Sequence, residues 1–109
     1  MNIKIPNKIK IATYEYTVFY VPNLEYDHKL LAQCLTDKQQ IKIAPKNKKV
    51  QNVSFLHEIC HAISDVYGCG LTEENTDRMA HGIAELLFNN LEIEFDWGDF
   101  DKLEGLNES

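Results

Sequence analysis

The chain has 109 residues, 44% of them hydrophobic and 26% charged, which is typical of one globular domain whose core needs no disulfide. Its net charge of −6 argues against mainly electrostatic binding of nucleic acid, which requires clustered Lys and Arg. No signal segment is recognisable, no apolar run reaches the roughly 18 residues of a membrane helix, and the three cysteines have no paired spacing. We therefore expect a cytoplasmic protein with reduced thiols and no membrane partner.

The first 45 residues are expected to be rich in β-strand. Segment 8–21 is dominated by β-branched and aromatic residues, with a turn expected near residues 12 and 13. A hairpin is expected to follow, with strands at 31–35 and 40–44. These segments predict a small antiparallel sheet of three to four strands.

The pattern changes from strand to helix after residue 45. Segment 52–67 has a helical period and Gly68 is placed to end it. Thr72 is a good N-cap for a second helix over 72–90. The acidic, aromatic tail at 91–109 is compatible either with a short strand or with a segment that wraps the domain. The fold class predicted is α+β, a sheet followed by two principal helices, in one domain spanning residues 1–109.

An H-E-x-x-H motif, His57-Glu58-Ile59-Cys60-His61, lies on the first predicted helix. Residues four apart share one helical face, so both imidazoles can reach one Zn²⁺ ion, with Glu58 beside it as a general base. Catalytic zinc takes three protein ligands and keeps a position for water. Apolar residues gather on the opposite side of the helix, which should pack on the sheet: Phe55, Ile59, Ala62, Ile63 and Val66.

The second predicted helix offers the third metal ligand. At about 100° per residue, Glu73 shares a stripe with Ala80 and Ala84, where a carboxylate is costly unless it is paired or bound to metal. Glu74 falls with Arg78 and Glu85 on the solvent face, so the pattern favours Glu73. Asp77 lies one turn beyond Glu73 and is the candidate partner for the free N–H of a metal-bound imidazole.

The segments 57–63 and 71–80 resemble the compact zincin metallopeptidases of bacteria and their phages, the ImmA/IrrE-like group and its small SprT-like relatives. The resemblance covers roughly residues 50 to 90. It implies a minimal zincin fold, Zn²⁺ and cleavage of a protein substrate, often a repressor. It also implies a third ligand followed four residues later by a polar supporting residue, which maps onto Glu73 and Asp77. Cys60 departs from the small or aliphatic residue usual at its position.

A peptidase mechanism needs two further elements. The oxyanion formed during peptide hydrolysis needs a hydrogen-bond donor besides the metal, for which Tyr67, His81 and Tyr26 are the candidates. An extended peptide substrate needs a sheet edge beside the cleft, and strand 40–44 is the candidate for this β-augmentation.

Two other hypotheses compete with the hypothesis that the protein is an enzyme. A catalytically silent, zinc-bound module that binds a partner such as a repressor would need His57, His61 and Glu73, but not Glu58. An ordinary α+β interaction domain with an accidental motif would need none of them, and it leaves Glu73 on an apolar stripe unexplained.

Overall fold

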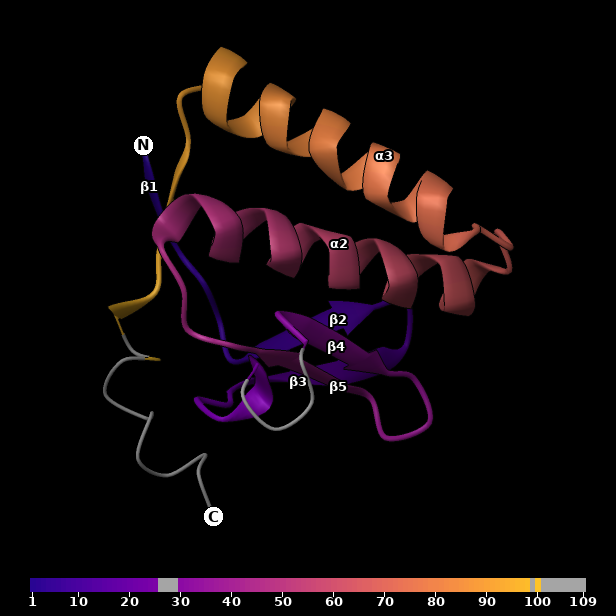
Figure 1. Cartoon of the computed structure of the whole chain (residues 1–109). Coiled ribbons are helices and arrows are strands. Elements are labelled where there is room, and N and C mark those ends of the chain that lie inside the picture. Colours follow the sequence, from indigo (N-terminus) through magenta and orange to yellow (C-terminus); the bar gives the residue numbers. More distant parts are fainter. Residues whose placement is uncertain (26–29, 99, 101–109) are drawn as a thin grey trace.

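A long central helix lies across one face of a four-stranded sheet and is covered on its other side by a second helix (Figure 1). This arrangement comes from a computed structural model, which describes residues 1–25, 30–98 and 100. It confirms the α+β class. The three layers follow one another in the order sheet, helix α2, helix α3.

The four strands of this sheet are arranged in the order β2-β3-β5-β4. They are β2 (Lys8–Ile11), β3 (Tyr14–Tyr20), β4 (Ala32–Leu35) and β5 (Gln40–Ile43). The two predicted hairpins, β2–β3 and β4–β5, are present and antiparallel. The expectation of a wholly antiparallel sheet is wrong at its centre, where β3 and β5 run parallel. The chain crosses to the outer edge to form β4, so β5 returns beside β3 in the same direction.

One face of the sheet carries the core. Alternate residues of the two central strands point to the same side and are buried there: Tyr16, Val18, Tyr20, Ile41 and Ile43. A strand has a side-chain period of two, so this alternation turns the polar residues of β5 to the other face. The buried face packs against helix α2, whose Phe55 and Ala62 are also buried, whereas Ile63 remains 38% exposed.

Helix α2 (Lys48–Tyr67) carries the H-E-x-x-H motif. It begins before the predicted residue 52 because the side chain of Asn47 caps it, accepting a hydrogen bond from the backbone N–H of Val50 at 3.1 Å. It ends where expected, at Gly68. This residue adopts a left-handed conformation with φ of 65°, which glycine reaches without a steric penalty.

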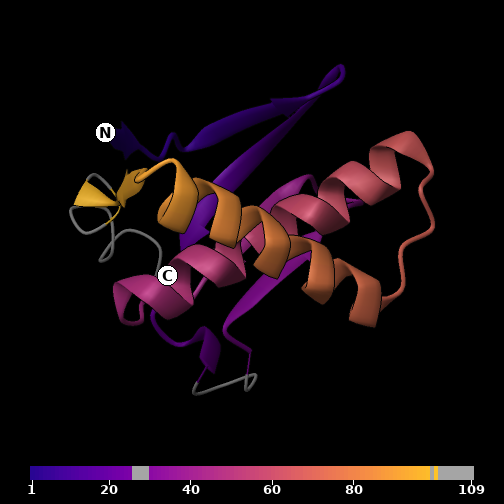
Figure 2. The same cartoon turned by 90° about the horizontal axis from the view of Figure 1, so that it is seen from above.

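Helix α3 (Glu73–Ala84) returns antiparallel along α2 and crosses it at an angle (Figure 2). Thr72 caps it as predicted, accepting from the N–H of Asn75 at 3.1 Å. The helical run continues as a π-helical segment, η1 (Glu85–Asn90), so it ends at the predicted residue. None of the helices in the described residues is long and apolar enough to cross a membrane.

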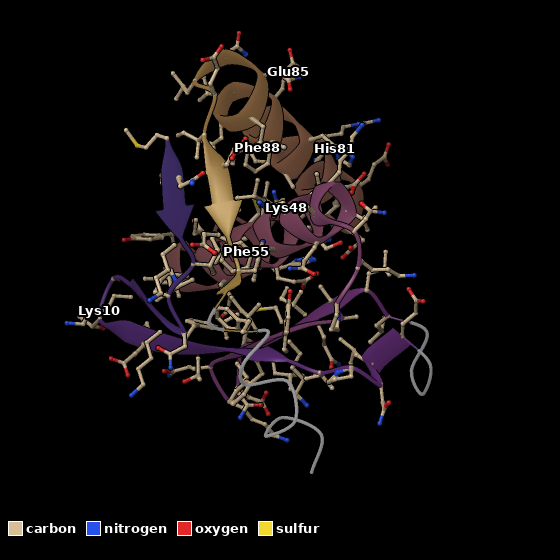
Figure 3. The ribbon with its side chains drawn as sticks, turned by 90° about the vertical axis from the view of Figure 1, so that its left-hand side faces the viewer. Lys10, Lys48, Phe55, His81, Glu85 and Phe88 are labelled. Carbon is tan, nitrogen blue, oxygen red and sulfur yellow. The ribbon has the colours of Figure 1, made fainter. Side chains whose placement is uncertain are left out.

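The two ends of the described chain meet in a second, two-stranded sheet. Strand β1 (Asn2–Lys4) pairs in parallel with β6 (Glu94–Asp96), and the two arrows run side by side in Figure 3. Phe95 of β6 packs edge-on against Phe55 and Phe88, with ring centroids 6.1 and 5.0 Å away. The beginning of the acidic tail is therefore part of the core.

Trp97 anchors the tail to helix α2. The indole is 5% exposed and donates a hydrogen bond to Asn52 Oδ1 at 2.7 Å. We expect Trp97→Phe to lower the free energy of unfolding by about 1–3 kcal/mol, because the buried Asn52 carbonyl loses its donor. Urea unfolding of this variant, of Asn52→Leu and of the double variant measures the coupling. The double variant should lose less than the sum of the single losses, and strictly additive losses would contradict the role of this bond.

Candidate metal centre

Three side chains from α2 and α3 converge at one point on the surface of the helix pair. His57 Nε2 lies 3.1 Å from His61 Nε2 and 2.6 Å from Glu73 Oε1, and His61 Nε2 lies 2.9 Å from Glu73 Oε2. The structure thus brings together the three residues that the sequence pattern nominates as metal ligands. We call His57, His61 and Glu73 the triad.

The convergence follows from local structure. His57 and His61 are one turn apart on α2, so their rings project from the same face. Ser64, near the end of α2, accepts a hydrogen bond at its hydroxyl from the backbone N–H of Leu71 at 3.0 Å. This bond holds the short connection to α3 close to α2, which brings Glu73 in the first turn of α3 back over the two rings.

The triad fits a zinc ion. Two imidazoles and one carboxylate are a donor set found in catalytic zinc sites, with zinc–ligand bonds of about 2.0–2.2 Å. A tetrahedral geometry with such bonds separates the ligand atoms by roughly 3.3–3.5 Å. The 3.1 Å between the imidazole nitrogens is close to this value, and the carboxylate contacts are shorter, within hydrogen-bonding range. Small shifts of the Glu73 side chain would open the space for the ion.

The burial of Glu73 differs from the sequence-based expectation. Its side chain is 75% exposed, although Ala80 and Ala84 of the same stripe are buried. The carboxylate lines an open cavity beside α2. The cost of burying a charge therefore does not explain the position of Glu73. Its contacts to His57 and His61 explain it instead. Glu74 points to solvent as predicted, and it pairs there with Arg78.

Asp77 stands behind the triad, one turn beyond Glu73. Its Oδ1 lies 3.4 Å from Nδ1 of His57 and 3.6 Å from Nδ1 of His81. The ring of His81 is also held by the backbone carbonyl oxygen of Asp77, 2.8 Å from Nδ1. Asp77 is thus placed to orient the His57 ring with Nε2 facing Glu73, the position expected for a partner of a metal-binding imidazole.

Glu58 lies beside the triad and is 8% exposed. Burial raises the pKa of its carboxyl group to about 7, and Glu73 adds to the rise. His57 and a backbone hydrogen bond from Cys34 act in the opposite direction. A carboxyl group with a pKa near neutrality can both accept and return a proton at physiological pH.

The triad lies in a cleft between α2 and strand β4. Two open cavities of about 710 and 510 Å³ adjoin it, and both are lined by Glu58 and Ala32. Strand β4 is the edge of the sheet among the described residues. The expectation that strand 40–44 borders the cleft is therefore wrong, because β5 lies inside the sheet between β3 and β4.

The three candidate oxyanion donors differ in position. His81 lines the smaller cavity, together with His57 and Glu58. Tyr67 lies at the end of α2, is 63% exposed and lines neither cavity. Tyr26 lies outside the described residues.

Several residues that line the cleft were not identified from the sequence, among them Cys34 and Asp65. Cys34 of β4 lines the larger cavity beside Glu58, and burial, with the charges of Glu58 and Asp65, raises the pKa of its thiol to about 12. Asp65 lines the same cavity, one turn after His61. The position of Asp65 in the cleft could have been predicted from the sequence, because it lies one turn after His61 on the same helix. The position of Cys34 could not, because nothing local in the sequence marks β4 as the edge strand. Cys60, within the motif, is buried.

Comparison with protein-family models, curated proteins and solved structures finds no significant match to this chain. The zincin resemblance and the activity that it implies therefore rest on the residues and geometry of the chain itself.

Proposed function

We propose that this protein is a zinc-dependent metallopeptidase that hydrolyses a peptide bond of a protein substrate. The observation that carries the proposal is the convergence of His57, His61 and Glu73 beside the buried carboxyl group of Glu58. Two imidazoles and a carboxylate leave zinc a fourth position for water, which is the arrangement of a catalytic site rather than a closed structural one. The substrate class and the cytoplasmic location are proposals too, the latter supported by three free cysteines.

The roles of the side chains follow from their positions. When bound, zinc supplies a Lewis acid that activates water and polarises the scissile carbonyl. Glu58, buried beside the triad, takes the proton of the attacking water and delivers it to the departing amine. Asp77 fixes the orientation of the His57 ring. His81 is the described candidate best placed to donate a hydrogen bond to the substrate, because it lines the cleft.

An extended substrate has a place to bind along β4. Ala44 N–H donates to Leu31 O at 2.9 Å, so the antiparallel alternation turns the backbone groups of Ala32 and Cys34 away from β5. That side of β4 borders the cleft, where the carboxylate of Glu58 engages the backbone of Cys34. A peptide laid along β4 would add a strand to the sheet and pass its backbone over the triad.

Metal analysis tests the proposal together with a peptidase assay. Protein purified without chelator should hold about one zinc per chain, as a His₂Glu site requires, and should cleave unfolded protein substrates until a chelator removes the metal. His57→Ala and Glu73→Ala should lose both the zinc and the activity. Glu74→Ala is the matched control, because it removes an equivalent carboxylate that points to solvent.

The outcomes separate the peptidase from its rivals. Zinc without cleavage of any substrate would favour a catalytically silent module that binds a protein partner such as a repressor. A wild-type protein that takes up no zinc even when it is supplied would reject both and leave an interaction domain.

A further inference from the structure

The cleft has two chemically different flanks, one on each side of the triad. The larger cavity, which we call the polar flank, exposes similar amounts of polar and apolar surface, and its polar residues include Thr36, His61, Ser64, Asp65 and Glu73. The smaller cavity, which we call the apolar flank, exposes mainly apolar surface, including that of Leu31, Val50 and Val53. Its titratable lining residues are Lys49, His57, Glu58, Asp77 and His81.

The two flanks follow one line along α2. Val53, His57, His61 and Asp65 are spaced four residues apart, so successive turns of the helix present an apolar residue, the two imidazoles and a carboxylate. Twelve residues of α-helix span about 18 Å, which is the length of roughly five or six extended residues. A peptide that crosses the triad would therefore meet both flanks at once.

We propose that the cleft selects polypeptide segments with a bulky apolar side chain on one side of the scissile bond and a basic side chain on the other, an inference that rests on the proposed peptidase function. The apolar flank, at about 510 Å³, has room for a side chain the size of Leu, Met or Phe. On the polar flank, Asp65 is exposed and faces an incoming lysine or arginine.

Lys49 strengthens the distinction between the two flanks. It lines the apolar flank, where the carboxylate of Asp77 already contacts the rings of His57 and His81. A substrate bound in the reverse order would therefore place its basic side chain beside Lys49, which repels it. Asp65 and Lys49 thus act as specificity-determining residues, because they distinguish the two possible orders of the apolar and the basic side chain along the peptide.

Peptide binding to the zinc-loaded Glu58→Gln variant tests this inference without turnover. The probes are fluorescein-labelled dodecapeptides of Ala, Gly and Gln that carry one Leu and, about five residues away, either Arg or Glu, in both orders. In one of the two orders the Arg peptide should bind about fivefold more tightly than the Glu peptide, as expected for an exposed ion pair set against a like-charge pair. Replacing the Leu by Ala should weaken binding about tenfold.

A charge reversal identifies the residue responsible. Adding Asp65→Lys to the Glu58→Gln protein should reverse the preference, so that the Glu peptide binds more tightly. Adding Glu15→Lys should leave the preference intact, because Glu15 is exposed on β3, which β5 separates from the cleft strand β4, and it lines neither flank. Equal binding of the Arg and Glu peptides, an unchanged preference in Asp65→Lys, or no binding of any peptide would overturn the inference.

The same peptides separate this inference from the proposed function. Charge-selective binding without hydrolysis by the zinc-loaded wild-type protein would sustain the recognition and reject the peptidase. Hydrolysis of the Arg and Glu peptides at equal rates would sustain the peptidase and reject the recognition.

Discussion

Replacing Glu58 by Gln is expected to lower peptide turnover by about 10²–10⁴-fold, the usual contribution of a general base, while zinc stays bound. The amide keeps the size of the side chain but cannot take a proton from water. The three proposed zinc ligands lie on other residues, so the metal content should not change. Steady-state cleavage of a peptide substrate and elemental analysis of the same preparations measure the two quantities.

The control for this variant is Glu74→Gln, which makes the same chemical change at an exposed residue that pairs with Arg78. It should retain both turnover and zinc. Unchanged turnover in Glu58→Gln would remove Glu58 from the mechanism. A parallel loss of zinc and turnover would instead show that the buried carboxyl group supports the geometry of the triad.

Features that depend on near neighbours in the chain could be predicted from the sequence. Thr72 and Gly68 mark helix ends because capping is decided within one turn. Ile41 and Ile43 are buried as their alternation predicts, because a strand places every second side chain on one face. The approach of His57 to His61 also needs only a helix.

Features that depend on distant pairing could not be predicted in the same way. Strands β1 and β6 are three residues each, and they pair although their sequences lie at opposite ends of the described chain. The parallel neighbours β3 and β5 are separated by β4, which takes the outer edge. This crossover decides whether β4 or β5 borders the cleft. The alternation of side chains along each strand would be the same whether that strand lay at the edge or inside the sheet, so the sequence does not distinguish the two arrangements.

Glu73 illustrates the limit of a helical projection. The projection gave the direction of its side chain correctly, since the carboxylate reaches both imidazoles. It gave no measure of depth, and the side chain is 75% exposed at a point where α3 overhangs the cleft. The angle of a residue on a helix and its distance from solvent are independent quantities, because the second depends on where the helices cross.

The buried carboxyl group of Glu58 should make the stability of the metal-free protein depend on pH. Its pKa is raised from an ordinary value of 4.5 to about 7 in the folded protein. Below pH 4.5 the group is protonated in both the folded and the unfolded state, so its effect on stability is neutral there. Between pH 4.5 and pH 7 the unfolded chain has lost the proton that the folded protein keeps, so the free energy of unfolding falls by up to about 3 kcal/mol across this range and levels off above it.

Chemical unfolding in chelator from pH 4.5 to pH 8 measures this fall, and comparison with Glu58→Gln isolates it from other groups that titrate in the same range. The wild-type protein should lose about 3 kcal/mol more than the variant, and Glu74→Gln should follow the wild type. Added zinc should shrink the difference, because a cation beside Glu58 favours its charged form. Parallel curves for wild type and Glu58→Gln would mean that the carboxyl group ionises as readily in the folded protein as in the unfolded chain. The same burial that weakens the metal-free fold at neutral pH keeps a proton acceptor beside the triad, so stability and the proposed chemistry are linked through this one side chain.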